Sequence, residues 1–198
     1  MKSGSSAHGM TEPMIVHTLS GQIDLHHIDP SAIHLIDIAR GLAATARYRG
    51  QTRWSKTWRT YSVAEHSVLV SHCQWCLGPS LAAPRWALLH DAPEAYLHDV
   101  IRPIRRSVLS KEFFSIERKI YLALGVRFGL GARFDSDEIL PVVTAADDYL
   151  LESEIEHLTT IPRDEKHLTP NWWLCRPPWS PEKACKQFLR RAKQLDLR

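Results

Sequence analysis

The sequence predicts an all-α protein with one short β-hairpin near its N-terminus. Apolar residues recur at the spacing of amphipathic helices in stretches beginning near residues 31, 62, 84, 110, 135 and 180. Most of these stretches open with a Ser, Asp or Pro, which favour helix N-termini. Only residues 14–18 and 22–25, on either side of Leu19-Ser20-Gly21, suggest a strand pair. We therefore expect about six helices and a hairpin.

Length and composition indicate one domain. The chain has 198 residues, and we assign 14–198 to a single domain and 1–13, which is small, polar and unpatterned, to a flexible N-terminal tail. No apolar run approaches the roughly 18 residues of a membrane span, and no secretory signal is visible at the N-terminus. We expect a cytoplasmic protein with no membrane partner.

The charge balance is mildly basic, with a formal net charge of +3. This charge suits an anionic small substrate as well as a nucleic acid. Because the basic residues form no long stripe, a stable nucleic-acid complex is not expected. Cys73 and Cys76 form a C-x-x-C within a helical pattern, far from Cys175 and Cys185. A zinc ribbon needs two tight pairs, so we interpret all four as reduced cysteines.

The helix boundaries follow from local signals. Asp29 or Ser31 can cap a first helix that ends near residues 47–50, and Ser62 with Glu65 resembles a capping box for a second. Pro84 opens a third. The basic, aromatic loop 51–61 between the first two is either a solvated connection or a wall that faces phosphate and base. Ser110 can cap a fourth helix, Pro141 can kink a fifth, and Ser180 caps the last.

One pair of residues is out of place in this pattern. His90 and Asp91 lie side by side in an apolar helical run, where an unpaired carboxylate is costly. His66 shares the inward face of its helix with Val63 and Val70. Asp147 shares an inward face with Val143 and Leu151, whereas Asp148 points to solvent. A lone inward histidine is more often a core residue satisfied by hydrogen bonds, and that alternative stays open at this stage.

Taken together, His66, His90, Asp91 and Asp147 form a mixed imidazole and carboxylate set. Such a set suits one divalent transition metal, Co, Mn, Zn, Fe or Ni, with Mg as a further candidate, rather than Ca. Glu94 follows on the same helical side and can accept or donate a proton. Arg47, Arg102 and Arg105 flank the ligand helices and could balance phosphate charge.

At these residues the chain resembles the HD-domain phosphohydrolase superfamily. The family pattern is a His, a His-Asp pair and a later Asp, matched here by Tyr-Ser-Val-Ala-Glu-His-Ser, His-Asp-Ala-Pro-Glu-Ala and Ala-Ala-Asp-Asp-Tyr-Leu-Leu-Glu-Ser-Glu. The resemblance covers roughly residues 15–160. It implies an all-helical HD-domain bundle around one divalent metal and a metal-dependent phosphohydrolase acting on (deoxy)nucleotides.

Within that superfamily, the chain is most similar to bacterial 5′-deoxynucleotidases and small deoxynucleoside triphosphohydrolases. The resemblance implies that Arg47, Tyr48 and Arg105 contact the nucleotide and that Glu94 and Asp99 are catalytic. The loop between Arg47 and His66 is about four residues longer than in the deoxynucleotidases. Family members are commonly oligomers, so we expect a homo-oligomer, with the Trp-rich segment 171–179 as a candidate interface or as local core packing.

Other activities remain as alternatives. One is a triphosphohydrolase that releases triphosphate from a substrate such as dATP, and another, of a different class, is a non-catalytic nucleotide sensor. Ala95 replaces the acid expected after Glu94 in guanosine tetraphosphate hydrolases, which disfavours that activity. His98 is the single histidine between the His-Asp pair and Asp147, which disfavours a two-metal cyclic-dinucleotide phosphodiesterase.

Overall fold

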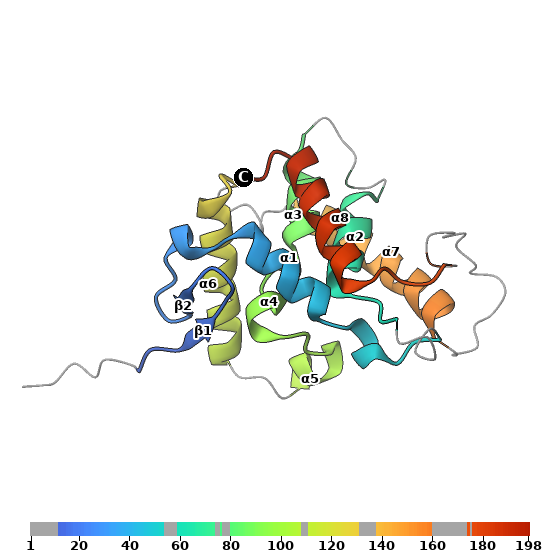
Figure 1. Cartoon of the computed structure of the whole chain (residues 1–198), viewed down its shortest axis with the longest axis horizontal. Coiled ribbons are helices and arrows are strands. Elements are labelled where there is room, and N and C mark those ends of the chain that lie inside the picture. Colours follow the sequence, from blue (N-terminus) through green and yellow to red (C-terminus); the bar gives the residue numbers. More distant parts are fainter. Residues whose placement is uncertain are drawn as a thin grey trace, which may run out of the picture.

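The chain folds into a mostly helical protein with a short antiparallel hairpin at its N-terminal end (Figure 1). The computed structural model describes residues 12–53, 59–73, 76, 80–107, 111–130, 138–159, 174 and 176–198. In this part of the chain there are eight α-helices, of which α4 and α5 are shorter than eight residues. The prediction of a helical fold with a hairpin is confirmed. Residues 1–11 of the expected tail lie outside the described residues.

The helices and strands have the following bounds. The hairpin pairs β1 (Ile15–His17) with β2 (Gln22–Asp24), in the register Val16 opposite Ile23. Two 3-10 helices are η1 (Pro30–Ala32) and η2 (Arg47–Gly50). The α-helices are α1 (Leu35–Ala44), α2 (Val63–Ser71), α3 (Ala82–Leu89), α4 (Glu94–Leu97), α5 (Arg102–Ser107), α6 (Lys111–Arg127), α7 (Leu140–Leu158) and α8 (Pro181–Gln194).

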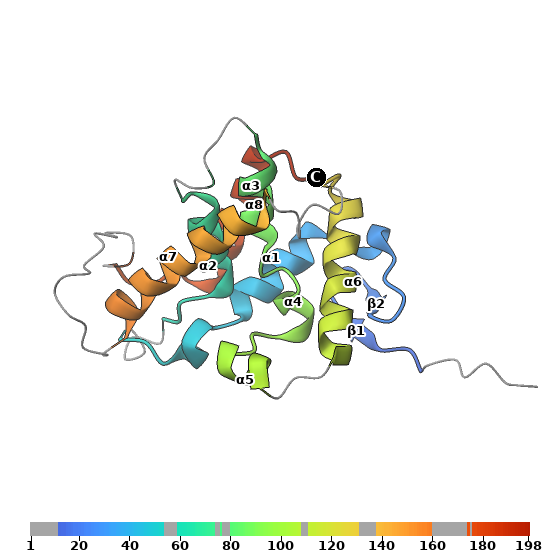
Figure 2. The same cartoon turned by 180° about the vertical axis from the view of Figure 1, so that it is seen from behind.

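Helix α2 is the centre of the bundle. It contacts α1, α3, α7 and α8. Helix α8 crosses α2 on one side in Figure 1, and α7 crosses it on the other in Figure 2. Every residue of α2 except Leu69 is buried. A helix buried all round is normally apolar, so the polar side chains of Glu65, His66 and Ser67 need partners inside the protein.

The N-terminal cap of α2 matches the predicted capping box only in part. The Ser62 hydroxyl accepts from the backbone N–H of Glu65, as expected. The Glu65 carboxylate does not reach back to Ser62. It accepts from the backbone N–H of Trp179 at 2.7 Å and pairs with Arg176 at 3.0 Å, so it fastens the segment before α8 onto α2. The capping box is therefore half formed, because burial gives Glu65 a tertiary partner instead.

Three helix boundaries differ from the prediction. The first helix is split, because Asp29 caps the short η1 and the extended Ile33 separates it from α1. Helix α2 ends at Ser71 rather than near residue 77. Pro141 lies in the first turn of α7, where its missing N–H costs nothing, so it begins the helix instead of kinking it.

Helix α4 packs closely on α1. A Cβ built at Gly41 would lie 2.8 Å from the Cβ of Ala95, which is closer than atoms can approach. The absence of a side chain at residue 41 therefore allows α4, which begins with Glu94, to lie against α1. This packing fixes the position of Glu94 relative to the bundle core.

Helix α6 and Trp179 both pack against other parts of the same chain. Helix α6 lies beside the hairpin region, where the Lys119 ammonium donates to the carbonyl of His26 (Figures 1 and 2). In the described part of the Trp-rich segment, Trp179 packs against the core of the same chain. Self-association stays a prediction. Among the described residues, no helix has the length and apolar character needed to cross a bilayer.

Candidate metal centre

Two histidine rings meet in the middle of the bundle. His66 lies in α2, and His90 is the C-cap residue that directly follows α3. Their Nε2 atoms are 3.2 Å apart, and both side chains are buried. The structure therefore brings together two of the residues that the sequence analysis singled out.

The other ring nitrogen of each histidine is already engaged. Nδ1 of His66 donates to the Glu154 carboxylate at 2.6 Å, and Nδ1 of His90 donates to the carbonyl of Ala87 at 2.7 Å. Because a carbonyl and an ionised carboxylate can only accept, each neutral ring carries its proton on Nδ1 and its lone pair on Nε2. Two lone pairs facing each other at 3.2 Å require a cation or a proton between them. Metal-binding histidines show the same arrangement.

Two carboxylates approach the same point. Oδ1 of Asp147 lies 3.1 Å from Nε2 of His66 and 3.9 Å from Nε2 of His90. Oδ2 of Asp91 lies 3.6 Å from Nε2 of His66 and 3.2 Å from Nε2 of His90, and it is buried without a hydrogen bond. The donor atoms of His66, His90 and Asp147 all lie within 4.8 Å of one another, so this group could hold a metal ion. The orphaned oxygen of Asp91 is suited to be a fourth ligand.

The electrostatics of the cluster favour a positive charge. Burial alone would lower the pKa of His90, but the carboxylates of Asp91 and Asp147 raise it to about 9. Burial would raise the pKa of Asp91, but the two histidines and Arg47 lower it to about 2. The pKa of Asp147 is lowered in the same way. The carboxylates favour the protonated form of the histidines and the histidines favour the ionised form of the aspartates, so the cluster has the charge to attract a cation.

The sequence suggested that the His90-Asp91 pair lies in the interior of a helix. In the structure the pair lies just after the end of a helix. Helix α3 ends at Leu89, and residues 90–93 form a turn before α4. Pro93 has no N–H to donate to the carbonyl of Leu89, so the α-helical ladder stops there. In the turn, the backbone N–H of Ala92 donates to the carbonyl of Leu89, and the backbone N–H of Glu94 donates to the carbonyl of Asp91. The pair still faces the centre, but the turn rather than a helical face directs it there.

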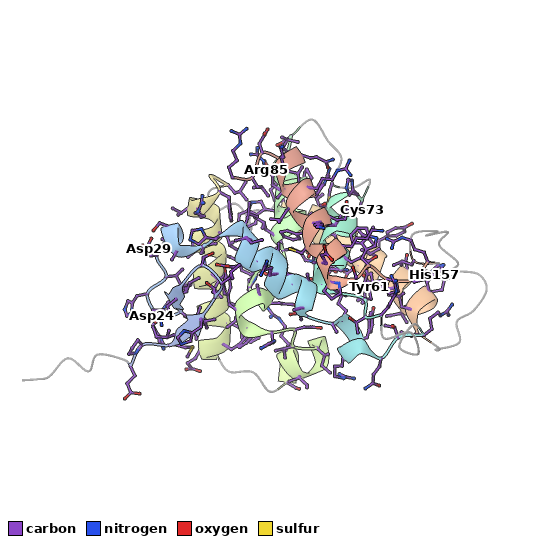
Figure 3. All side chains as sticks on the ribbon, viewed as in Figure 1. Asp24, Asp29, Tyr61, Cys73, Arg85 and His157 are labelled. Carbon is purple, nitrogen blue, oxygen red and sulfur yellow. The ribbon has the colours of Figure 1, made fainter. Side chains whose placement is uncertain are left out.

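Glu154 is a site residue that the sequence analysis missed. Its side chain is fully buried, and its carboxylate accepts from His66, Arg47, Tyr48 and Tyr61 (Tyr61 is labelled in Figure 3). Burial would raise its pKa, but Arg47 and His66 lower it, so the carboxylate is ionised. A sequence signal existed, because Glu154 is seven residues, or two turns, after Asp147 and therefore lies on the same face of α7.

The two residues predicted to be catalytic, Glu94 and Asp99, both line the cavity beside the candidate metal ligands. Burial and the nearby charges of Asp91 and Asp99 raise the pKa of Glu94 to about 9. One oxygen of Glu94 is buried without a hydrogen bond. Burial also raises the pKa of Asp99. Burial and the neighbouring carboxylates therefore both favour the protonated form of Glu94.

Arg47 and Tyr48 line the same cavity as the candidate metal ligands His90, Asp91 and Asp147. The Arg47 guanidinium lies 3.0 Å from Glu154 and 3.6 Å from Asp91, and it is largely buried. Tyr48, Arg49 and Gly50 all have left-handed backbone angles, with φ of 53°, 53° and 72°. Such angles cost about 1–3 kcal/mol for a non-glycine residue and persist only where the surroundings enforce them. Here the hydrogen bond from Tyr48 to Glu154 holds the turn.

Arg105 lines the same cavity, but it is already paired. Its guanidinium forms two hydrogen bonds with Glu117, one of 2.6 Å, and it lies 5.2 Å above the ring of Phe114. Glu117 neutralises this arginine, so its contact with phosphate stays a prediction. The side chain of Arg102 and residues 54–58 of the basic loop lie outside the described residues. Arg53, by contrast, is described, and it donates to backbone carbonyls at the C-terminal end of α7.

A cavity of about 1350 Å³ opens in front of the cluster. His90, Asp91 and Asp147 contribute to its wall, and so do the residues of η2 and the segment that follows. Small-ligand sites have volumes of about 300–1,000 Å³, so there is room for a ligand of nucleotide size. A small molecule in this cavity could therefore reach the metal ligands directly.

Sequence comparison with known proteins identifies relatives of this chain. The chain is 38% identical over 144 residues to the uncharacterized protein RCAP_rcc00048 of Rhodobacter capsulatus, and the match covers 71% of this chain and 70% of that protein. The chain belongs to the family of this Rhodobacter protein. It is also 35% identical over 103 residues to the uncharacterized protein YfdR of Escherichia coli, which covers 52% of this chain and 51% of that protein. No protein-family model matches the chain.

Proposed function

We propose that the protein is an HD-type, metal-dependent phosphohydrolase that acts on (deoxy)nucleotides. The observation that carries this proposal is the convergence of two imidazole lone pairs and two carboxylate oxygens at the wall of a cavity of about 1350 Å³. The chain order of these ligands, His66, His90-Asp91 and Asp147, is that of the superfamily which the sequence resembles. The site leaves one side of the cluster open to a ligand.

A divalent metal held by these four residues would polarise a phosphoryl oxygen and lower the pKa of a nearby water. The residues of the chain have separate tasks. Glu94 lies beside the ligands and can move a proton, because burial and Asp91 raise its pKa. Arg47, between Glu154 and Asp91, supplies a fixed positive charge for a phosphate group. Asp99 faces the same cavity and can help to position the substrate.

The charges favour a substrate with few phosphate groups. Of the four described arginines that line the cavity, two, Arg47 and Arg105, are paired with Glu154 and Glu117, which reduces the positive charge left for a substrate. A triphosphate carries more negative charge and requires more free cations than a monophosphate. Among the described residues, this pairing supports a 5′-deoxynucleotidase activity over release of triphosphate. The second candidate remains a non-catalytic nucleotide sensor, which would need the cavity and the arginines but not Glu94.

The deciding experiment is a panel of nucleoside mono- and triphosphates, with ribose and deoxyribose, incubated with the protein and Mn, Co, Zn or Mg. Released phosphate, pyrophosphate and triphosphate are measured separately. We expect phosphate release from a deoxynucleoside monophosphate, and its loss on chelation. Release of triphosphate would instead support the alternative hydrolase.

Two variants separate the enzyme from the sensor. Asp147→Ala removes a proposed metal ligand, and Glu94→Gln removes the proposed proton carrier while leaving the ligands in place. An enzyme loses turnover in both variants. A sensor would bind nucleotide without turnover in the unaltered protein. Full turnover by Asp147→Ala in the presence of chelator would refute the metal mechanism.

A further inference from the structure

The two oxygens of the Glu154 carboxylate face two different parts of the site. Oε1 accepts from Nδ1 of His66 at 2.6 Å and from the hydroxyl of Tyr61 at 2.8 Å. Oε2 accepts from Nε of Arg47 at 3.1 Å and from the hydroxyl of Tyr48 at 3.0 Å. One oxygen therefore supports a metal ligand, and the other supports the cavity wall.

We propose that Glu154 is a positioning residue that couples the metal site to the Arg47–Tyr48 wall. In this arrangement, the charge that orients His66 for a metal is the same charge that holds Arg47 closer to Glu154, at 3.0 Å, than to Asp91, at 3.6 Å. The inference rests on the proposed function for the identity of the substrate, whereas its metal part rests on the geometry of the cluster alone.

The effect on His66 follows from the hydrogen bond to its Nδ1. A carboxylate at this nitrogen fixes the ring orientation and places the lone pair on Nε2, which points to the cluster. Loss of such an outer partner typically weakens metal binding by about 10- to 100-fold. Tyr61 donates to the same oxygen and holds the carboxylate in place without adding charge.

The effect on Arg47 follows from its position between two carboxylates. Its guanidinium lies 3.0 Å from Glu154 and 3.6 Å from the ligand oxygen of Asp91. Glu154 is fully buried, so removal of its charge would leave the arginine without its nearest counter-ion. Arg47 would then move closer to Asp91, tighten the existing 3.6 Å ion pair and compete with the metal for that oxygen. Glu154 thus protects a metal ligand that it does not touch.

The test measures Co²⁺ affinity of the full-length protein by visible absorption and by isothermal titration, with no nucleotide present. Glu154→Gln is compared with Glu152→Gln, the same change at an exposed residue of the same helix. We expect Glu154→Gln to weaken Co²⁺ binding by about 10- to 100-fold and to alter the Co²⁺ spectrum. Glu152→Gln is expected to change neither. Unchanged Co²⁺ affinity in a folded Glu154→Gln protein would overturn the proposal.

A double-mutant cycle tests the coupling itself. Arg47→Met in the Glu154→Gln protein should restore part of the lost Co²⁺ affinity, because the competing charge at Asp91 is gone. The two substitutions are then non-additive, as expected for residues in one network. Strictly additive effects would show that Glu154 acts on His66 alone and would refute the coupling.

A second variant covers the case in which Glu154→Gln fails to fold. Glu154→Asp keeps the charge but is one methylene shorter, so it cannot reach both His66 and Arg47. It should also weaken Co²⁺ binding, and unchanged affinity would again overturn the proposal. Because Co²⁺ binding is measured without substrate, a protein that binds Co²⁺ but hydrolyses no nucleotide would refute the proposed function and leave this inference standing.

Discussion

Adjacent aspartates on α7 provide a sharp test of the metal centre. Asp147 lies 3.1 Å from Nε2 of His66, whereas its neighbour Asp148 is exposed. Asp147→Asn and Asp148→Asn remove the same charge from consecutive residues of one helix. We expect the first to abolish most of the stabilisation that a metal provides and the second to leave it intact.

The size of the effect follows from mass action. A metal present at 100 times its dissociation constant stabilises the folded protein by about 2.7 kcal/mol. For a chain of this length, 1 kcal/mol corresponds to about 2–4 °C in Tm, so Tm should rise by about 5–11 °C. If Asp147→Asn weakens binding by about 100-fold, the same metal concentration stabilises by about 0.4 kcal/mol, or about 1–2 °C.

The assay is thermal unfolding, followed by circular dichroism, with and without Mn²⁺ or Co²⁺. The measured quantity is the difference in Tm that the metal causes within each protein, so a general change in stability cancels. Asp148→Asn should show the shift of the unaltered protein. An equal metal-induced shift in Asp147→Asn and Asp148→Asn would refute the assignment of Asp147 as a ligand.

Three further predictions concern other residues. Glu94→Gln should lower the rate of nucleotide hydrolysis by about 10²- to 10⁴-fold while keeping the metal-induced Tm shift, and loss of that shift would contradict a pure proton-transfer role. Burial raises the pKa of the Cys76 thiol from 9.0 to about 11, so a smaller fraction of the thiol is ionised at pH 8. Because the thiolate is the reactive form, iodoacetamide should alkylate Cys76 about 100-fold more slowly in the folded than in the unfolded protein. Labelling at equal rates, followed by mass spectrometry, would show that Cys76 is accessible and ionised. Phe188→Ala should cost about 3–5 kcal/mol in the free energy of unfolding measured in urea, because this side chain of α8 is fully buried, whereas Arg190→Ala at an exposed position should cost little.

Helical periodicity in the sequence determined which residues point inward. His66 shares a helical face with Val63 and Val70, and Asp147 was separated from Asp148 by face alone. The structure places both residues at the centre of the bundle. Such residues are predictable because a buried helical face depends on local spacing, which the sequence contains in full.

The same reasoning was less successful at the turn and at the caps. The apolar run around His90 predicted one continuous helix. In the structure α3 ends at Leu89, because Pro93 cannot donate to its carbonyl. Glu65 had the spacing of a capping residue, but it pairs with Arg176 and with the backbone of Trp179. A local pattern cannot show that a distant segment offers a buried carboxylate a stronger partner.

The sequence by itself therefore determined the helical class, the inward faces and the four candidate metal ligands. Tertiary structure alone decided how their charges are balanced. Arg47 and Glu154 are 107 residues apart in the chain, and Arg105 is paired with Glu117 on the next helix. Periodicity reports that a side chain is buried, but the partner of a buried charge is set by the packing of whole helices against one another. This is why the folded chain was needed to show that Glu154 hydrogen-bonds both to His66 and to Arg47 in the cavity wall.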